Sequence, residues 1–274
     1  MAIGTLLRKV KRLQALVALQ RQAPTVLEAL RDDPTKVLTC ANMPPDPWQE
    51  QALRSKAQRM LLLASRQGGK SSVAAALALH TALLIPRSPV LLLSPSIRQS
   101  GELFLKVKNL FNALGRPATV TAETLSRVEF ANGSRVLSLP GTEGTIRGFS
   151  DVALLVIDEA ARVEDALYYS VRPMLAVSQG RLVALSTPFG KRGWFHDAWH
   201  SIEAWDRIKV TAPECPRITP EFLAEERQAL GERWYRQEYL CSFEDTVDAV
   251  FAWEDIRAAL SPAVRPLTFP ETPA

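Results

Sequence analysis

The chain has 274 residues, of which 47% are hydrophobic and 23% are charged. This is the balance of a globular protein with one large domain, or one domain and a small satellite. The three cysteines, Cys40, Cys215 and Cys241, are far apart in the sequence, which excludes a disulfide framework and predicts reduced thiols. A net charge of +4 indicates only a mild preference for an anionic partner. There is no apolar run of 18 residues, so we expect no membrane span and, by default, a cytoplasmic location.

The first 41 residues are expected to form an N-terminal helical segment. Apolar residues recur at helical spacing through residues 3–31, and Pro24 separates two helices. The opposite face is basic, and it could contact DNA or a partner, although packing on the domain with a solvated basic face is favoured. The proline-rich stretch 42–47 predicts a rigid connector outside regular structure, followed by a helix over 48–58.

From residue 60 onward, buried strands alternate with helices. The pattern predicts strands at 60–64 and 90–94, followed by helices at 71–84 and 100–114 respectively. Such alternation is typical of a parallel sheet covered on both faces. Asn132-Gly133 predicts a hairpin over 127–139. Further strands are expected at 154–157 and 182–185, with a candidate strand at 208–210, a charged helix over 220–239 and a loose tail from residue 262.

The turn after the first predicted strand is Ser65-Arg66-Gln67-Gly68-Gly69-Lys70-Ser71. It matches the phosphate-loop pattern Gly-x-x-x-x-Gly-Lys-[Ser/Thr], except that Ala64 replaces the leading glycine. The two glycines allow backbone N–H groups to approach phosphate oxygens, and the following helix N-terminus adds its positive end. Lys70 is expected to reach the β- and γ-phosphates, and the Ser71 hydroxyl to ligate magnesium. A glycine turn beside a surface lysine is the alternative.

Two acids, Asp158 and Glu159, follow the predicted strand 154–157. A strand end holds a side chain rigidly, so Asp158 is expected to coordinate Mg²⁺ through water and Glu159 to activate the attacking water. An adjacent glutamate indicates an ATPase that hydrolyses its nucleotide. The alternative is an ordinary strand-to-helix cap, which is disfavoured about 90 residues after a phosphate loop.

Two more segments are candidates for contact with the nucleotide. The amide of Gln49 can both donate to and accept from adenine, and Trp48 could stack on the base or simply pack. Ser186 and Thr187 follow the strand at 182–185, so they should reach the same sheet edge as Asp158. They could sense the γ-phosphate, or they could cap a turn before Pro188.

Taken together, these motifs resemble the ATPase domain of the large terminase subunit, the DNA-packaging motor of tailed bacteriophages. The resemblance covers roughly residues 42–245. The segments that carry it are Trp48-Gln49, the loop Ser65–Ser71 with its internal Arg66, Ser94-Pro95-Ser96 with Gln99-Ser100, Thr145-Ile146-Arg147-Gly148, Asp158-Glu159, and Ser186-Thr187-Pro188 with Phe189-Gly190.

The resemblance implies an α/β, RecA-like (ASCE-type) P-loop NTPase with a mainly parallel sheet and a small C-terminal lid subdomain. It implies a core over 42–204, a lid over 205–250 and a linker over 251–274. It further implies ATP and Mg²⁺ as cofactors, translocation of double-stranded DNA, and a homo-oligomeric ring, usually of five subunits. A portal protein, a small terminase subunit and a place on the procapsid in the host cytoplasm follow from the same family.

The resemblance also implies roles for individual residues. Arg66 would touch the γ-phosphate in cis, and Arg147 is the candidate arginine finger for the neighbouring subunit's nucleotide, with a surface ion pair as its alternative. Ser186-Thr187 would match the family's coupling motif. The implied nucleotide-binding set is Trp48, Gln49, Ser65, Arg66, Gln67, Gly68, Gly69, Lys70, Ser71, Ser72, Asp158, Ser186 and Thr187.

One departure from the family concerns length. Large terminases carry a nuclease domain after the ATPase domain, and 274 residues leave no room for it, so nuclease activity is not expected in this chain. A helicase-type ATPase is the second candidate, but no second set of buried strands follows Pro188. A non-hydrolysing nucleotide-binding regulator is disfavoured by Glu159.

Overall fold

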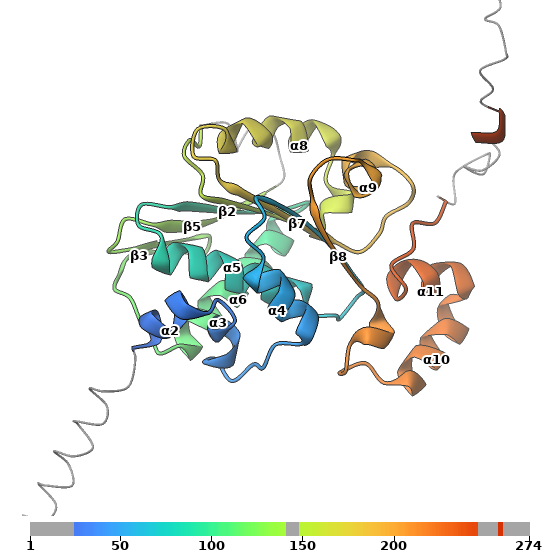
Figure 1. The fold of residues 1–274 in the computed structure, drawn as a ribbon, viewed down its shortest axis with the longest axis horizontal. Coiled ribbons are helices and arrows are strands. Elements are labelled where there is room, and N and C mark those ends of the chain that lie inside the picture. Colours follow the sequence, from blue (N-terminus) through green and yellow to red (C-terminus); the bar gives the residue numbers. More distant parts are fainter. Residues whose placement is uncertain (1–24, 141–147, 246–256, 260–274) are drawn as a thin grey trace, which may run out of the picture.

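The computed structural model describes residues 25–140, 148–245 and 257–259. Its centre is an eight-stranded sheet with the strand order β3-β4-β5-β2-β6-β7-β1-β8. Helices cover both faces of this sheet, and a small helical unit lies beyond the β8 edge (Figure 1). The strands β2, β5, β6, β7, β1 and β8 pair in parallel, whereas β3 and β4 add an antiparallel edge. The predicted α/β fold with a mainly parallel sheet is confirmed.

The observed strands extend most of the predicted ones by a residue or two. They are β1 (Arg59–Ala64), β2 (Pro89–Ser94), β3 (Val120–Glu123), β4 (Arg127–Phe130), β5 (Arg135–Pro140), β6 (Leu154–Asp158), β7 (Arg181–Ser186) and β8 (Asp206–Val210). The hairpin at Asn132-Gly133 joins β4 and β5 as predicted, with Gly133 at φ +83°. The strand β3 was not predicted, because its short alternation of exposed and half-buried residues gives little signal.

The helices are α2 (Val26–Asp32), α3 (Lys36–Thr39), α4 (Pro47–Arg54), α5 (Lys70–Leu84), α6 (Ile97–Ala113), α8 (Asp165–Val171), α9 (Gly193–His200), α10 (Pro220–Leu230) and α11 (Glu232–Glu238). Short 3₁₀ turns are η1 (Ala160–Arg162), η2 (Arg172–Leu175) and η3 (Ala212–Glu214). The predicted helix before Pro24 lies outside the described residues.

Four helix boundaries differ from the predictions, each for a local reason. The connector 42–47 ends one residue early, because Pro47 is tolerated at the first position of α4. That helix stops at Arg54, short of residue 58. The helix α6 starts at Ile97 because the Ser96 hydroxyl accepts the Gln99 N–H as an N-cap. The predicted helix over 220–239 is two helices, broken at Gly231, whose φ is +77°.

Two apolar layers sandwich the sheet. The helices α5 and α6 pack on one face, against β-strand side chains such as Leu62 and Leu92, and α8 and α9 pack on the other, against Leu61 and Leu91. The alternation along each buried strand therefore feeds two cores, which is why the strands read as continuous apolar runs. A third, small cluster joins η3, α10 and α11 through Ala212, Leu223, Tyr235 and Tyr239.

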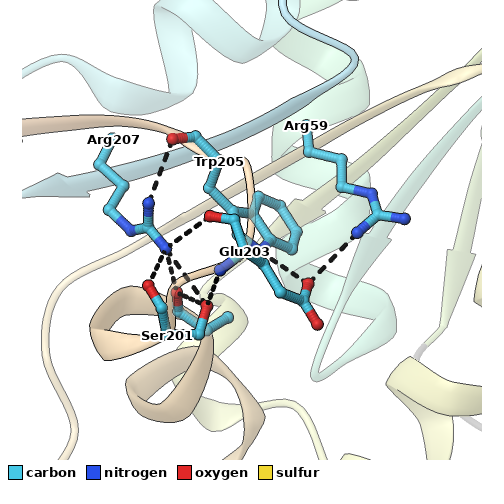
Figure 2. Close-up of polar contacts among 6 residues, drawn as sticks. Arg59, Ser201, Glu203, Trp205 and Arg207 are labelled. Atoms are coloured by element: carbon cyan, nitrogen blue, oxygen red, sulfur yellow. Dashed lines mark hydrogen bonds and ion pairs between the residues drawn. The ribbon is translucent and has the colours of Figure 1, made fainter.

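The strand β8 is tied to the sheet by an arginine inside a loop, shown in Figure 2. The Arg207 guanidinium donates to the carbonyl oxygens of Ser201, Glu203 and Trp205 at 2.7, 3.1 and 3.2 Å. The carboxylate of Glu203 pairs with Arg59 of β1 at 3.2 Å. These contacts close the α9–β8 connection. Because β8 pairs with β1 over its whole length, the sheet continues past residue 204, where the core was predicted to end.

Candidate nucleotide-binding site

The Ser65–Ser71 loop lies between the carboxyl end of β1 and the first turn of α5. Gln67 and Gly69 adopt positive φ values of +59° and +97°, so the chain reverses sharply before the helix starts at Lys70. A Cβ on Gly69 would lie 2.7 Å from Gln49 Nε2, so that position requires glycine for space as well as for conformation. The loop is therefore shaped with backbone exposed at a helix N-terminus, an arrangement suited to an anion.

Lys70 and Glu159 meet across the sheet edge. The distance from Lys70 Nζ to Glu159 Oε1 is 3.1 Å, and the side chains are 10% and 20% exposed. Glu159 itself adopts a left-handed conformation at φ +51°, which is uncommon for a residue with a side chain and typical of functional sites. The structure thus brings together the two motifs that the sequence placed about 90 residues apart.

Asp158, the last residue of β6, is buried, with 7% exposure. Burial, opposed by the nearby Lys70 charge, raises the pKa of its carboxyl to about 6. One Asp158 oxygen accepts the Glu159 N–H at 3.0 Å. A buried carboxylate with an incompletely balanced charge favours a cation beside it.

The hydroxyl pair after β7 is also buried. Ser186 and Thr187 are 0% and 1% exposed, and Ser186 Oγ accepts the N–H of Ala161 at 3.1 Å. Ser186 thereby connects the end of β7 to the 3₁₀ turn that follows Glu159. The contact is the capped turn considered from the sequence, and it places both residues at the same sheet edge as Asp158.

Gln49 approaches the loop from α4. Its Nε2 donates to the carbonyl oxygen of Gly69 at 3.4 Å, and its Oε1 accepts the Asp46 N–H at 2.9 Å. A cavity of about 450 Å³ opens beside Gln49, Gly69 and Ser72. Its neighbour Trp48 is 9% exposed and packs in the core cluster of α5 and α6. The structure therefore places Gln49 at the loop and Trp48 in the core.

Two arginines have different places from those expected. The Arg66 side chain is 64% exposed, and its Nε lies 3.0 Å from Glu238 Oε2 at the end of α11. Arg147 lies outside the described residues.

Sequence reasoning missed Arg217, Arg162 and Glu238. Arg217 pairs with Asp46 at 2.8 Å and donates to the Gly68 carbonyl at 3.1 Å, so it closes the loop from the far side of the 450 Å³ cavity. Arg162 approaches Glu159 at 3.6 Å and Glu238 at 3.9 Å. No local motif marks these residues, because each reaches the loop from a distant segment. The only available signal was the position of Arg162 three residues after Glu159.

The histidine pair forms no metal site. His196 Nδ1 lies 3.0 Å from Asp197, and His200 Nδ1 lies 2.9 Å from the His196 carbonyl, with both rings packed on Phe243. Within the described ranges, no three His, Cys, Asp or Glu side chains are grouped to hold a metal ion. Nor does that part of the chain contain a helix of the length and apolarity needed to cross a membrane.

The sheet order, the glycine-containing loop at the start of α5 and the acidic pair after β6 define a RecA-like P-loop NTPase. The family model "Terminase large subunit, T4likevirus-type, N-terminal" matches residues 61–258. The chain belongs to this family of large terminase subunits.

Similar proteins agree with this assignment. The chain is 25% identical over 210 residues to "Terminase, large subunit" of Escherichia phage T5, covering 70% of this chain and 47% of that protein. It therefore spans about half the length of this curated relative.

Among solved structures, the ATPase domain of the Thermus phage P74-26 large terminase is 19% identical with a TM-score of 0.67, over 75% of this chain and 96% of that one. The large terminase of a second thermophilic bacteriophage is 13% identical with a TM-score of 0.62, over 72% and 53%. The HK97 large terminase is 16% identical with a TM-score of 0.59, over 72% and 50%. These likenesses establish the fold.

Proposed function

We propose that this chain is the ATPase motor portion of a large terminase, which hydrolyses ATP to translocate double-stranded viral DNA into a procapsid. The observation that carries the proposal is the 3.1 Å contact between Lys70 and Glu159 at the mouth of the Ser65–Ser71 loop. Family membership supports the packaging role. Crystal structures of the second thermophilic phage's large terminase, in complex with ADP and with ATP-γ-S, support nucleotide binding.

In this proposal the loop N–H groups and Lys70 bind the phosphates, and Glu159 orients and deprotonates the attacking water. The remaining residues of the site support this arrangement. Gln49 and Arg217 border the cavity that would take the base and ribose, and Ser186 and Thr187 report the state of the γ-phosphate to η1 through the Ser186–Ala161 contact.

The donors present fit magnesium. Ser71 and Asp158 offer a hydroxyl and a carboxylate, the hard oxygen ligands that Mg²⁺ selects, and nucleotide phosphates and water complete such sites. The buried Asp158 carboxyl with its raised pKa is a group whose charged form a divalent cation stabilises. When bound, Mg²⁺ would neutralise charge on the β- and γ-phosphate oxygens.

Assembly is part of the proposal. We infer a homo-oligomeric ring around DNA, with five subunits as the expected number, in which Arg147 reaches the neighbouring subunit's nucleotide. Contacts with a portal protein and a small terminase subunit, on the procapsid in the host cytoplasm, follow from the family. The three-part division into an N-terminal segment, a core and a lid is supported by the separate apolar cluster of η3, α10 and α11.

Phosphate release from ATP by the purified chain tests the proposal, measured with and without linear double-stranded DNA and with EDTA in place of Mg²⁺. We expect Mg²⁺-dependent turnover, and DNA binding that weakens as salt rises because condensed counterions are released from the duplex. DNA binding that is insensitive to salt, or no turnover with any DNA, would contradict the motor.

A helicase-type ATPase is separated from the motor by a strand-displacement assay on a tailed duplex. We expect no displacement, because all the strands in the described ranges belong to one sheet, whereas such helicases complete their nucleotide site with a second RecA-like domain.

A further inference from the structure

Five charged side chains alternate in sign from the Ser65–Ser71 loop to α11 and back. Lys70 lies 3.1 Å from Glu159, Glu159 lies 3.6 Å from Arg162, Arg162 lies 3.9 Å from Glu238, and Glu238 lies 3.0 Å from Arg66. Both ends of this charge chain are in the same loop. Its middle, Arg162 and Glu238, comes from η1 and from the helical unit beyond β8.

Glu238 is the acid that joins the two arginines. It is the last residue of α11 and is 6% exposed, so its carboxylate requires charged partners to offset the loss of water. Arg66 and Arg162 supply them, one at each carboxylate oxygen, and Gln237 Nε2 donates to Oε1 at 3.2 Å. The backbone is tied as well, because the Arg66 N–H donates to the Glu238 carbonyl at 3.1 Å. The end of α11 is therefore seated on the loop.

Arg162 touches three separate segments of the site. Its guanidinium lies 4.2 Å from the centroid of the Phe189 ring, in the segment that follows Ser186-Thr187. The same side chain approaches Glu159 and Glu238. An arginine stacked on an aromatic ring keeps a defined plane, so it can hold a carboxylate oxygen in place better than a freely rotating cation.

We propose that Arg162 and Glu238 are positioning residues for Glu159, an inference that rests on the proposed ATPase function. Glu159 has one cation at each oxygen: Lys70 at Oε1 and Arg162 at Oε2. A γ-phosphate competes for Lys70, and Arg162 is then the cation that keeps the Glu159 carboxylate directed at the attacking water. Glu238 sets where Arg162 stands, so the position of α11 controls the orientation of the carboxylate.

The test compares Arg162→Gln, Glu238→Gln and the double variant with the wild-type chain. Three quantities are measured for each: kcat for ATP hydrolysis, Kd for a fluorescent ATP analogue, and Tm. Glu232→Gln is the matched control, since Glu232 is an acid on the same helix that pairs with Arg227 at the surface. We expect each single variant to lower kcat about tenfold while Kd changes less than about threefold, because misplacing a reacting group affects chemistry more than binding.

Two further results separate positioning from a merely structural role. The double variant should be no slower than the slower single variant, because both act through the same carboxylate. Arg162→Lys should recover part of the kcat lost in Arg162→Gln. Arg162 is 30% exposed, so its two variants carry the test even if Glu238→Gln lowers Tm.

The positioning role is overturned if Arg162→Gln keeps the wild-type kcat, if the losses multiply in the double variant, or if kcat falls only in proportion to folded protein. Wild-type turnover with these outcomes leaves the ATPase proposal intact. Absence of turnover in the wild-type chain overturns the ATPase proposal and the positioning role with it.

Discussion

Lys70 Nζ lies 3.1 Å from Glu159 Oε1, although β7 separates the strands from which the two residues emerge. The loop after β1 and the turn after β6 cross this gap at the carboxyl edge of the sheet, where ligands gather in α/β proteins. The contact joins a phosphate-binding cation to a candidate general base before any phosphate separates them. Substitutions at this contact and around it have distinct expected effects.

Replacing Glu159 with Gln should preserve ATP binding and abolish turnover. Glutamine keeps the size of the side chain but cannot accept the proton of the attacking water, so we expect kcat to fall by about 100-fold or more. Phosphate release and the Kd of a fluorescent ATP analogue measure the two effects separately. Wild-type turnover in this variant would remove Glu159 from its role.

Replacing Gly69 with Ala should weaken nucleotide binding. The added Cβ would lie 2.7 Å from Gln49 Nε2 and 3.2 Å from Arg217 Nη2, on a backbone with φ +97°. Strain of this kind costs about 1–3 kcal/mol, so we expect Kd to rise about tenfold or more. Gly101→Ala is the control, since a Cβ there meets nothing within 4 Å. Equal Kd values for both variants would show that the loop tolerates a side chain.

Mixing two inactive variants should restore activity if Arg147 acts in trans. Arg147→Ala subunits keep Lys70, and Lys70→Ala subunits keep Arg147, so an interface between them contains one complete site. We expect the mixture to hydrolyse ATP faster than either variant alone under conditions that assemble the ring, confirmed by light scattering. Assembled mixtures with no gain would place the finger elsewhere.

The ion pair between Asp33 and Arg54 should add stability only above acidic pH. Arg54 lowers the pKa of the Asp33 carboxyl to about 2, and the nitrogen–oxygen distance is 2.8 Å. A depressed acid stabilises the fold above its unfolded pKa, about 3.9, and this contribution is lost as pH falls toward about 2. The pair is exposed, so Asp33→Asn should cost less than about 1 kcal/mol at about pH 7.

Urea unfolding at neutral pH and at about pH 2.5 measures the difference for this pair. The gap between the wild-type chain and Asp33→Asn should narrow at the lower pH. A gap that stays constant with pH would mean that the hydrogen bond from the Thr35 N–H to Asp33, at 3.0 Å, outweighs the ion pair.

The sequence alone determined the class of fold and the two central motifs. Apolar runs such as 90–94 are long enough and uniform enough to be buried only in a covered parallel sheet. The loop Ser65–Ser71 and Asp158-Glu159 are local patterns whose chemistry depends on residues adjacent in the chain. These features were readable because both the signal and its cause lie within a few residues.

Tertiary structure alone decided which distant side chains complete the site. Arg217 comes from the segment after β8, Glu238 ends a helix beyond a glycine break, and Arg66 turns toward that helix. Each of these contacts depends on the packing of α10 and α11 beside the sheet. Packing is set by the sum of many apolar contacts, such as those of Leu223 and Tyr239, and not by any motif near the residue. The sequence could therefore identify the loop and the carboxylates, but not the charges that hold them.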